Sequence, residues 1–388
     1  MTAAPRATRI YLDHNAGAPL LPAARAAMLA ALEHGGNPSS LHEEGRQARQ
    51  VIERARNQVA GLLGAPREEV IFTSGGTEAD QLGILGLAQR AERQGRPRRV
   101  ATSGLEHPAV QGAVRYLVRA LRWERVELAV DAHGRLQLPD RPEALGLVAV
   151  GWVNHELGVQ QDLAEVAAFA RRAGALGFVD AVQAAGKLAL GPLTAATGPL
   201  AGGLDGVAIS SHKLGGPKGA GALWLRSDAV EALPLVEGGH QERGRRPGTE
   251  NPVALAGFGA AAAAADLSTW PQVLARAAEL EDGLRAQGAR VHGALAPRLP
   301  STVNVAFDGA PGESIVMALD LVGVAASTGA ACSSGSVQPS PVLLALGLPP
   351  AAAREAVRFS LGPGVTAQDV QTVLSLLPDI VARVRRFA

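Results

Sequence analysis

Short apolar runs alternate with longer amphipathic stretches over the first two thirds of the chain, and this alternation restricts the fold more than any other feature. Short apolar runs are typical of buried strands, and the stretches between them have helical spacing. Such alternation predicts an α/β fold with a mostly parallel sheet covered by helices on both faces. The expected strands are 70–73, 100–102, 126–130, 147–152, 177–180 and 206–210, and the expected helices are 50–63, 79–94, 108–121 and 163–174.

The sequence changes character from about Leu255 and predicts a second, smaller unit. An alanine-rich segment is followed by a helical stretch to Gly288, a strand-like run at 303–307 and a helix at 313–320. Because alanine is the strongest helix former, the alanine run predicts a packed helix. We expect a large domain over residues 13–254, and a smaller α+β domain made of residues 1–12 and 255–388. With 388 residues and 47% hydrophobic composition, the chain can form cores of this size.

Charge and composition argue against several classes of partner. A formal net charge of +1 gives no field of the kind that nucleic-acid binders have, and we expect the cluster Arg96, Arg98 and Arg99 to be a solvated face. Residues 1–9 lack the apolar region of a signal peptide, and no uncharged stretch is long enough to span a membrane. One cysteine allows no internal disulfide and no cysteine metal cluster, so we predict a cytoplasmic protein without a metal site.

The single cysteine, Cys332, lies in a small, polar, glycine-rich stretch at 327–339. This setting predicts an exposed loop, because free cysteine in a core usually packs among larger apolar residues. A thiol on such a loop can act as a nucleophile. An inert surface cysteine is the alternative.

Two polar residues come directly after, or at the end of, predicted strands. Lys213 follows the strand 206–210, and Asp180 ends the strand 177–180. The carboxyl ends of parallel strands are where α/β proteins bind ligands. A lysine that forms a Schiff base and an aspartate that pairs with a protonated pyridine nitrogen are the protein's part of pyridoxal phosphate chemistry. Solvated turn residues at both positions are the alternative.

The run 73–78 predicts a phosphate site. The apolar strand ends here, Gly75 and Gly76 allow a close backbone turn, and Thr77 opens a helical segment. Backbone amides at a helix start, with the hydroxyl groups of Thr77 and Ser210, could hold a phosphate dianion. A plain turn with Thr77 as the helix cap is the alternative.

These residues give the chain a resemblance to a known family. It resembles the pyridoxal-phosphate-dependent cysteine desulfurases of the NifS/IscS type, which are class V aminotransferases with the aspartate-aminotransferase-like fold, the PLP-dependent transferase fold type I. The matching stretches are in family order nearly end to end: 11–19, 36–42, 73–78, 106–110, 154–158, 179–187, 210–221, 241–251, 327–339 and 358–362.

The resemblance implies an enzyme that uses pyridoxal 5'-phosphate to remove sulfur from L-cysteine and release L-alanine. Lys213 would hold the cofactor and move the substrate's α-proton, while Asp180 would keep the ring nitrogen protonated. Cys332 would attack the substrate's sulfur as a thiolate and keep it as a persulfide. His107 would stack on the cofactor ring and take part in proton transfer. A histidine that caps the helix starting at Pro108 is the alternative.

Other positions match residues that bind the cofactor or the substrate. A guanidinium binds both oxygens of a carboxylate, which suits Arg358 to the substrate's carboxylate, and an exposed strand arginine is the alternative. Because Thr249 would reach the phosphate in the neighbouring subunit, a two-fold homodimer is expected. The resemblance assigns Gly76, Thr77, His155, Gln183, Ser210, His212 and Thr249 to the cofactor, and Asn37 and Arg358 to the substrate.

Several positions depart from the family pattern. His155 stands where the family has a second asparagine, and an imidazole that titrates near neutral pH could alter the ionisation of the bound cofactor. Gly17 and Ala18 remove two hydroxyl groups near the substrate. His240 replaces a glycine, and Pro247 replaces a serine. The departures therefore concern the substrate more than the cofactor.

Two other functions are compatible with these residues. One is another pyridoxal enzyme, such as a selenocysteine lyase or a β-lyase, and a persulfide trapped on Cys332 would distinguish it from a desulfurase. The other is a non-catalytic paralogue that acts as an assembly subunit and lacks the yellow absorbance of the cofactor. The expected sulfur acceptor is a protein, either an iron–sulfur scaffold or a tRNA-thiolating enzyme.

Overall fold

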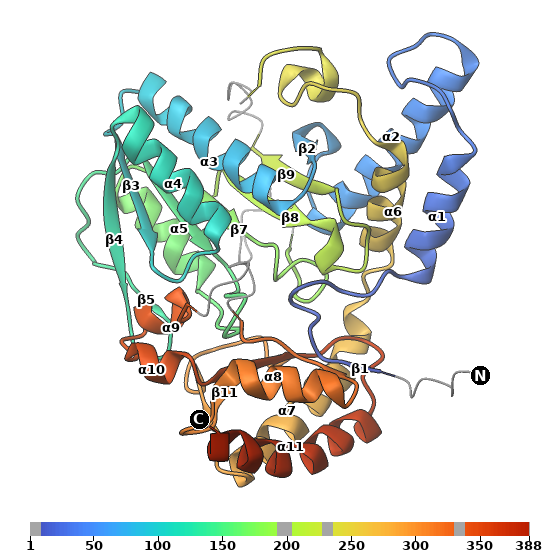
Figure 1. Ribbon diagram of the computed structural model, residues 1–388. Coiled ribbons are helices and arrows are strands. Elements are labelled where there is room, and N and C mark those ends of the chain that lie inside the picture. Colours follow the sequence, from blue (N-terminus) through green and yellow to red (C-terminus); the bar gives the residue numbers. More distant parts are fainter. Residues whose placement is uncertain (1–8, 192–203, 227–235, 330–337, 388) are drawn as a thin grey trace.

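The computed structural model describes residues 9–191, 204–226, 236–329 and 338–387 (Figure 1). An eight-stranded sheet is the centre of the larger, upper part in Figure 1, with the strand order β2-β9-β8-β7-β6-β3-β4-β5. Its strands are β2 (Val70–Thr73), β3 (Arg99–Ser103), β4 (Glu124–Val130), β5 (Leu136–Gln137), β6 (Leu147–Gly151), β7 (Leu176–Asp180), β8 (Gly206–Ser210) and β9 (Gly221–Leu225).

The sheet is mostly parallel, which confirms the predicted fold class. Strands β4, β3, β6, β7 and β8 form one parallel series. Strand β9 is antiparallel to both β2 and β8, and β5 is antiparallel to β4. Since β2 and β8 both oppose β9, they point the same way. The carboxyl ends of β2, β3, β6, β7 and β8 therefore share one edge of the sheet.

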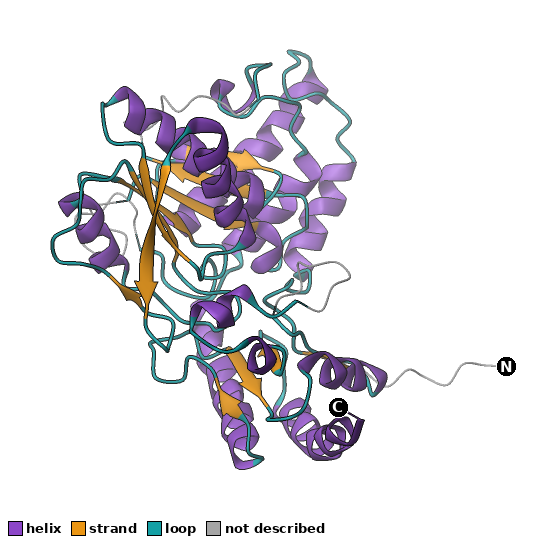
Figure 2. Cartoon of the chain, turned by 60° about the vertical axis from the view of Figure 1, so that its left-hand side comes forward, coloured by secondary structure: helices purple, strands orange, loops and turns teal. Residues whose placement is uncertain are grey.

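Helices cover both faces of the sheet, and Figure 2 shows the strands between them. On one face, α3 and α4 bury a core that includes Ile84, Val114 and Phe178. On the other face, α2, α5 and α6 contribute to a core that includes Phe169 and Trp224. The helices are α1 (Pro22–Leu32), α2 (Glu43–Leu63), α3 (Gly76–Arg93), α4 (Pro108–Leu121), α5 (Leu163–Arg172) and α6 (Pro252–Ala263).

Local sequence signals set several helix ends. Asp162 caps α5, because its side chain accepts from the backbone N–H groups of Ala164 and Glu165. Pro108 occupies the first turn of α4, where a missing N–H costs nothing. Helix α2 ends at Gly64, whose φ of 60° lies in the left-handed region that glycine adopts readily.

The smaller part mixes helices with short strands, as the α+β expectation requires. A parallel pair joins β1 (Ile10–Tyr11) to β12 (Val324–Ala325), and an antiparallel sheet has the order β10-β11-β13. Leu280, Phe307 and Phe359 belong to its core. The remaining elements are β10 (Arg290–Val291), β11 (Thr302–Ala306), β13 (Ala356–Ser360), α7 (Trp270–Ala286), α8 (Gly312–Leu321), α9 (Pro341–Ala345), α10 (Pro350–Ala353) and α11 (Ala367–Phe387).

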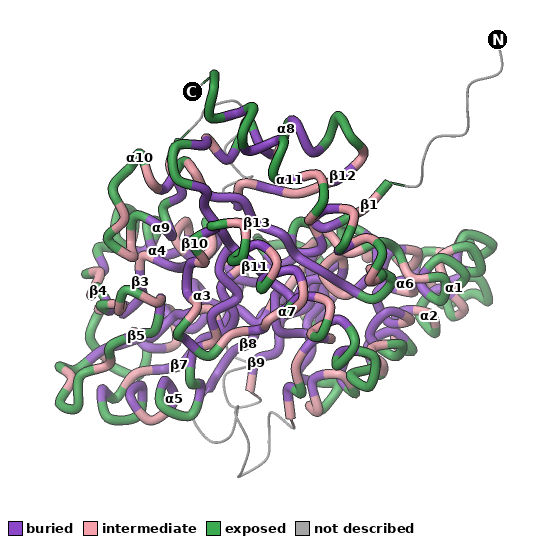
Figure 3. The backbone as a smooth tube through the Cα atoms, turned by 90° about the horizontal axis from the view of Figure 1, so that it is seen from below, coloured by how far each residue is buried: buried purple, intermediate pink, exposed green. Residues whose placement is uncertain are grey.

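The boundary between the two hydrophobic cores lies after α6. Helix α6 packs on α1 and α2, and its Leu255 and Phe258 are buried in the core of the larger part. Leu12 packs in the smaller core. Figure 3 shows strands such as β8 and β11 buried near the centre and exposed residues at the periphery. We therefore propose that the domain boundary lies between α6 and α7, one helix later than residue 254.

No single helix in the described ranges is both long and apolar enough to cross a bilayer. Among the described residues, one bent pair reaches that length and composition: α6 together with the segment Leu267–Ala286, which is bent by 58°.

Candidate active site

A cavity of about 580 Å³ lies at the carboxyl edge of the large sheet. Segments that follow β2, β3, β6, β7 and β8 line it, and the smaller part adds Gly329 and Arg358. The sequence-predicted residues that line this cavity are Gly76, Thr77, His107, His155, Asp180, Gln183, Ser210, His212, Lys213 and Arg358.

Lys213 lies in a short 3₁₀ turn, Ser211–Lys213, directly after β8. Its Nζ donates to the backbone carbonyl of Asn15 at 2.6 Å and to that of Ala16 at 2.9 Å. The amine is therefore held at the cavity wall by the segment that follows β1. Asn15 was not predicted as a site residue, because nothing local in the sequence places it opposite a lysine 198 residues away.

Asp180 ends β7 and accepts a hydrogen bond from the N–H of Val182 at 2.9 Å. A second carboxyl, Asp80 on α3, is 1% exposed, and its Oδ1 has no hydrogen-bond partner in the described part of the chain. Burial and the neighbouring Asp180 and Glu106 raise the pKa of Asp80 well above its usual value. Burial raises the pKa of Asp180 as well, against the opposing effects of the His107 charge, the Val182 N–H and the Lys213 charge. One carboxylate oxygen each from Asp80 and Asp180 and one ring nitrogen of His107 lie within 4.8 Å of one another.

Glu106 is a further buried carboxyl that sequence reasoning did not assign. Its Oε1 accepts from the Ser103 hydroxyl at 2.6 Å, and its Oε2 accepts from the N–H of Gly151 at 2.5 Å. Burial raises its pKa to about 8, against the opposing effect of these hydrogen bonds. Through these two hydrogen bonds, Glu106 links the end of β3 to the end of β6 in the wall of the cavity.

Two histidine rings contact each other in the wall of the cavity. The rings of His107 and His155 lie 5.1 Å apart in an edge-to-face arrangement at 78°. Burial lowers the pKa of both residues, and the charge of His107 lowers the pKa of His155 further. His107 also caps α4, because its Nδ1 accepts from the N–H of Ala109 at 3.1 Å. Capping and lining the cavity are therefore compatible roles for the same ring.

The start of α3 forms one end of the cavity. Thr77 is the second residue of this helix and not its cap, which is Gly75. A Cβ on Gly76 would lie 2.9 Å from Val182 Cγ2 and 3.3 Å from Ser210 Cβ, so the close approach of these segments requires glycine. The first-turn amides of a helix have no acceptor within the helix, which makes this end suitable for an anion.

Side-chain contacts brace this helix start. Glu78 accepts from the N–H of Ser74 at 2.7 Å and pairs with Arg246 at 2.7 Å. The Ser210 hydroxyl lies 2.9 Å from Nδ1 of His212. Burial and the nearby Lys213 and Lys218 lower the pKa of His212 to about 4, so its imidazole is neutral near pH 7.

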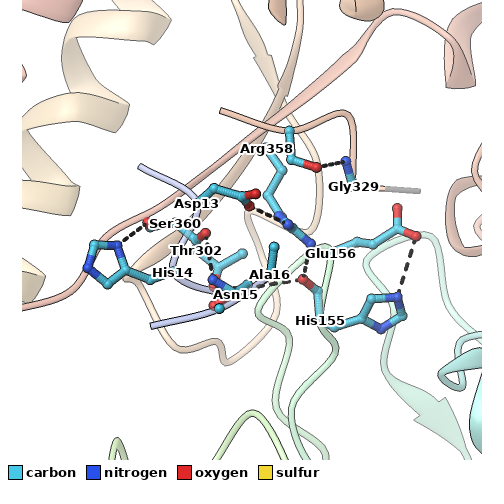
Figure 4. A network of polar contacts seen from close by, with 12 residues as sticks. Asp13, His14, Asn15, Ala16, His155, Glu156, Thr302, Gly329, Arg358 and Ser360 are labelled. Atoms are coloured by element: carbon cyan, nitrogen blue, oxygen red, sulfur yellow. Dashed lines mark hydrogen bonds and ion pairs between the residues drawn. The ribbon is translucent and has the colours of Figure 1, made fainter. Parts of the chain in front are cut away.

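Arg358 is buried where the two parts meet (Figure 4). Its guanidinium donates to Oδ1 of Asp13 at 2.7 Å and to the backbone carbonyl of His155 at 2.9 Å. Its Nε has no hydrogen-bond partner among the described residues. The alternative of an exposed strand arginine at position 358 is therefore wrong.

Figure 4 also shows how His155 is held. Its backbone carbonyl accepts from Nδ2 of Asn15 at 3.2 Å, and its ring Nε2 lies 3.6 Å from Oε1 of Glu156. Glu156 is buried and accepts from the Ser340 hydroxyl at 2.6 Å. The position at which this chain departs from the family pattern is therefore anchored from both sides.

The structure does not bring Asn37 or Thr249 to this cavity. Both are exposed, and the side chain of Asn37 accepts from the N–H of Ser39 in a local turn. Gly17 and Ala18 line a neighbouring hollow beside His212. Cys332 lies outside the described residues, and Gly329, three positions before it, lines the cavity.

Comparisons with known proteins identify the family. The model of the family Aminotransferase class-V matches residues 10–373, so this chain belongs to the class V aminotransferases. It is similar to a cysteine desulfurase of Cereibacter sphaeroides, with 43% identity and 97% of each chain covered. It is 40% identical to an IscS-like cysteine desulfurase of Mycobacterium tuberculosis, with 97% of this chain and 98% of that relative covered.

Solved structures have the same fold. A NifS-like protein superposes with a TM-score of 0.87 at 29% identity, covering 97% of this chain and all of that chain. A structure described as SspA in complex with cysteine has a TM-score of 0.78 at 29% identity, covering 92% of this chain and 99% of that chain.

Proposed function

We propose that this protein is a pyridoxal-phosphate-dependent cysteine desulfurase that converts L-cysteine to L-alanine and retains the sulfur on Cys332. One observation carries the proposal: Lys213 and Asp180 follow or end adjacent parallel strands and line one cavity in a class V aminotransferase chain. The relatives named cysteine desulfurase at 38–43% identity, and the likeness to a protein solved with cysteine, support L-cysteine as the substrate.

The residues present fit pyridoxal phosphate. The cavity offers an amine, a buried carboxylate for a protonated ring nitrogen and a helix start for a phosphate. A side chain at 76 would fill the space between α3, Val182 and Ser210. When bound, the cofactor supplies an electron sink that makes the substrate's α-proton removable.

The chain's own residues have separate tasks in this proposal. Lys213 would bind the cofactor's aldehyde through Nζ and then move the substrate's α-proton. Asp180 would hold the proton on the ring nitrogen, and His107 would lie against the cofactor. The phosphate would be held by Gly76, Thr77, Ser210 and His212, and the ring by Gln183 and His155.

Arg358 binds the substrate's carboxylate in this proposal. Its buried Nε lacks a partner in the described structure, and its pair with Asp13 fixes the plane of the guanidinium. The thiolate of Cys332 attacks the substrate's sulfur. The new S–S bond replaces the carbon–sulfur bond, whose electrons stay with the substrate's carbon, which then takes up a proton to give alanine.

The wider setting is also proposed. Thr249 and Asn37, which lie outside the cavity of their own chain, would serve the site of the second subunit in a homodimer. The sulfur then passes to an acceptor protein, an iron–sulfur scaffold or a tRNA-thiolating enzyme, in the cytoplasm.

The test is incubation of purified protein with L-cysteine, followed by measurement of alanine and of persulfide on Cys332. Lys213→Ala should abolish both products. Cys332→Ala should keep the absorbance of the bound cofactor and lose the persulfide. Normal sulfur transfer by Cys332→Ala would refute the assigned role of the thiol.

A further inference from the structure

The chain uses lysine sparingly, and every lysine lies at or beside the candidate active site. Its lysines are Lys187, Lys213 and Lys218, against 34 arginines. Lys213 and Lys218 line the cavity, and Lys187 is buried next to it with 7% exposure. A compact amine differs from a guanidinium in size, in geometry and in its ability to lose its charge. The position of Lys187 therefore calls for a role that an ordinary surface cation does not have.

Lys187 contacts two amide side chains. Its Nζ donates to Oε1 of Gln183 at 2.7 Å and to Oδ1 of Asn15 at 3.3 Å. Gln183 lies four residues before Lys187 in the turns that follow β7, while Asn15 comes from the segment after β1. All three side chains are buried. One amine therefore joins the turn after β7 to the N-terminal segment.

These contacts determine which way each amide faces. The N–H groups of Lys187 require an oxygen opposite them, so the NH₂ group of Gln183 must point the other way. That NH₂ group donates to the backbone carbonyl of Asn15 at 3.1 Å, the same oxygen that receives Nζ of Lys213. The NH₂ group of Gln183 is therefore a neighbour of the Lys213 amine at the cavity wall.

The same argument applies to Asn15. With its oxygen facing Lys187, its NH₂ group donates to the Thr302 hydroxyl at 2.8 Å and to the backbone carbonyl of His155 at 3.2 Å. Burial and the charges of Lys213 and Arg358 lower the pKa of Lys187 to about 7. A neutral amine keeps two N–H groups, so both contacts survive the loss of the charge.

We propose that Lys187 is a positioning residue that fixes the amide of Gln183 with its NH₂ group presented to the cofactor. The inference rests on the proposed function and deepens it, because it adds a residue that acts through Gln183 without touching the cofactor. Without Lys187, the amide of Gln183 can turn over and present its oxygen to the cavity.

The test is a double-mutant cycle that measures cofactor binding by pyridoxal phosphate titration and the absorption band of the bound cofactor, both without substrate. The variants are Lys187→Met, Gln183→Leu and their combination. Each single variant should raise the dissociation constant of the cofactor roughly fivefold to tenfold, the effect of losing one hydrogen bond. The double variant should bind no more weakly than the weaker single variant, because both remove the same contact.

Lys218→Met combined with Gln183→Leu is the matched control. This control removes another lysine at the cavity that has no hydrogen bond to Gln183 in the described part of the chain, so its effect should multiply with that of Gln183→Leu. If Lys187→Met does not fold, Lys187→Ala in the same cycle replaces it, with the same coupling expected.

Multiplicative effects of the Lys187 and Gln183 variants would overturn the inference, as would a Lys187 variant with the wild-type dissociation constant and absorption band. Failure of the proposed function gives a different result, since the wild-type protein itself would then bind no pyridoxal phosphate or leave L-cysteine unchanged.

Discussion

Glu242→Gln should destabilise the protein strongly, because Glu242 is half of a buried ion pair. Its Oε1 accepts from Arg56 at 2.6 Å, and its Oε2 accepts from Arg56 at 2.7 Å and from the N–H of Phe72 at 2.9 Å. The two side chains are 1% and 8% exposed. A glutamine supplies only one oxygen, so its NH₂ group must face a donor. The charge of Arg56 then keeps only its longer pair with the partly exposed Glu53 at 3.3 Å.

Breaking a buried ion pair from one side costs about 3–5 kcal/mol, and we expect about 3 kcal/mol because one acceptor remains. For a chain of this size, such a loss lowers Tm by about 4 °C. Glu242 also attaches the segment 241–251 to β2, and Thr249 lies in this segment. The variant should therefore also weaken the proposed dimer, as measured by analytical ultracentrifugation.

The assay is thermal unfolding of the wild type, Glu242→Gln and a matched exposed pair. Glu43→Gln breaks the pair with Arg46, whose side chains are 62% and 58% exposed, and should change Tm by less than about 1 °C. The double variant Arg56→Met with Glu242→Leu should be more stable than Glu242→Gln, because no unpaired charge is buried. Equal Tm values for Glu242→Gln and Glu43→Gln would refute the reasoning.

Two further predictions concern the cavity itself. Burial raises the pKa of Glu106 from 4.5 to about 8, so folding takes up a proton at pH values between these two. The contribution of Glu106 to the free energy of unfolding therefore falls as pH rises through this window. Glu106→Gln should remove that pH dependence when unfolding of the cofactor-free protein is measured at several pH values. A wild-type pH profile in the variant would contradict this assignment. Gly76→Ala should weaken cofactor binding about tenfold in titrations, because its Cβ would crowd Val182 and Ser210, whereas Gly61→Ala, with no heavy atom within 4 Å of the added Cβ, should bind normally. Unchanged affinity in Gly76→Ala would show that the helix start is not the phosphate site.

The elements predicted from apolar runs are largely those of the structure. The expected strands 70–73 and 206–210 coincide with β2 and β8, and the expected helix 108–121 coincides with α4. These segments are recognisable because one continuous apolar run or one amphipathic period covers the whole element. Helix α2 begins at Glu43, earlier than expected, because its first turns are polar and have no apolar period.

The positions of strand β9 and of the domain boundary depend on packing between segments that are far apart in the chain. A local sequence pattern carries no information about such packing. The run Gly221–Leu225 follows a glycine-rich turn, and its position between β2 and β8 is settled by hydrogen bonds to strands far apart in the sequence. Helix α6 has an alanine-rich composition with no clear apolar face, so the sequence could not indicate which core it joins.

The site residues divide in the same way. Lys213, Asp180 and His107 each follow or end a strand, so the topology of a parallel sheet gathers them at one edge. Asp80 and Asn15 were missed because their roles depend on contacts across the fold.

The most direct test of the central claim is borohydride reduction of the protein loaded with pyridoxal phosphate, followed by peptide mapping by mass spectrometry. The three lysines of this chain make the result unambiguous. The account predicts a pyridoxyl group on the peptide that contains Lys213 and none on Lys187 or Lys218. A pyridoxyl group on either of the other two lysines, or on no lysine, would contradict it.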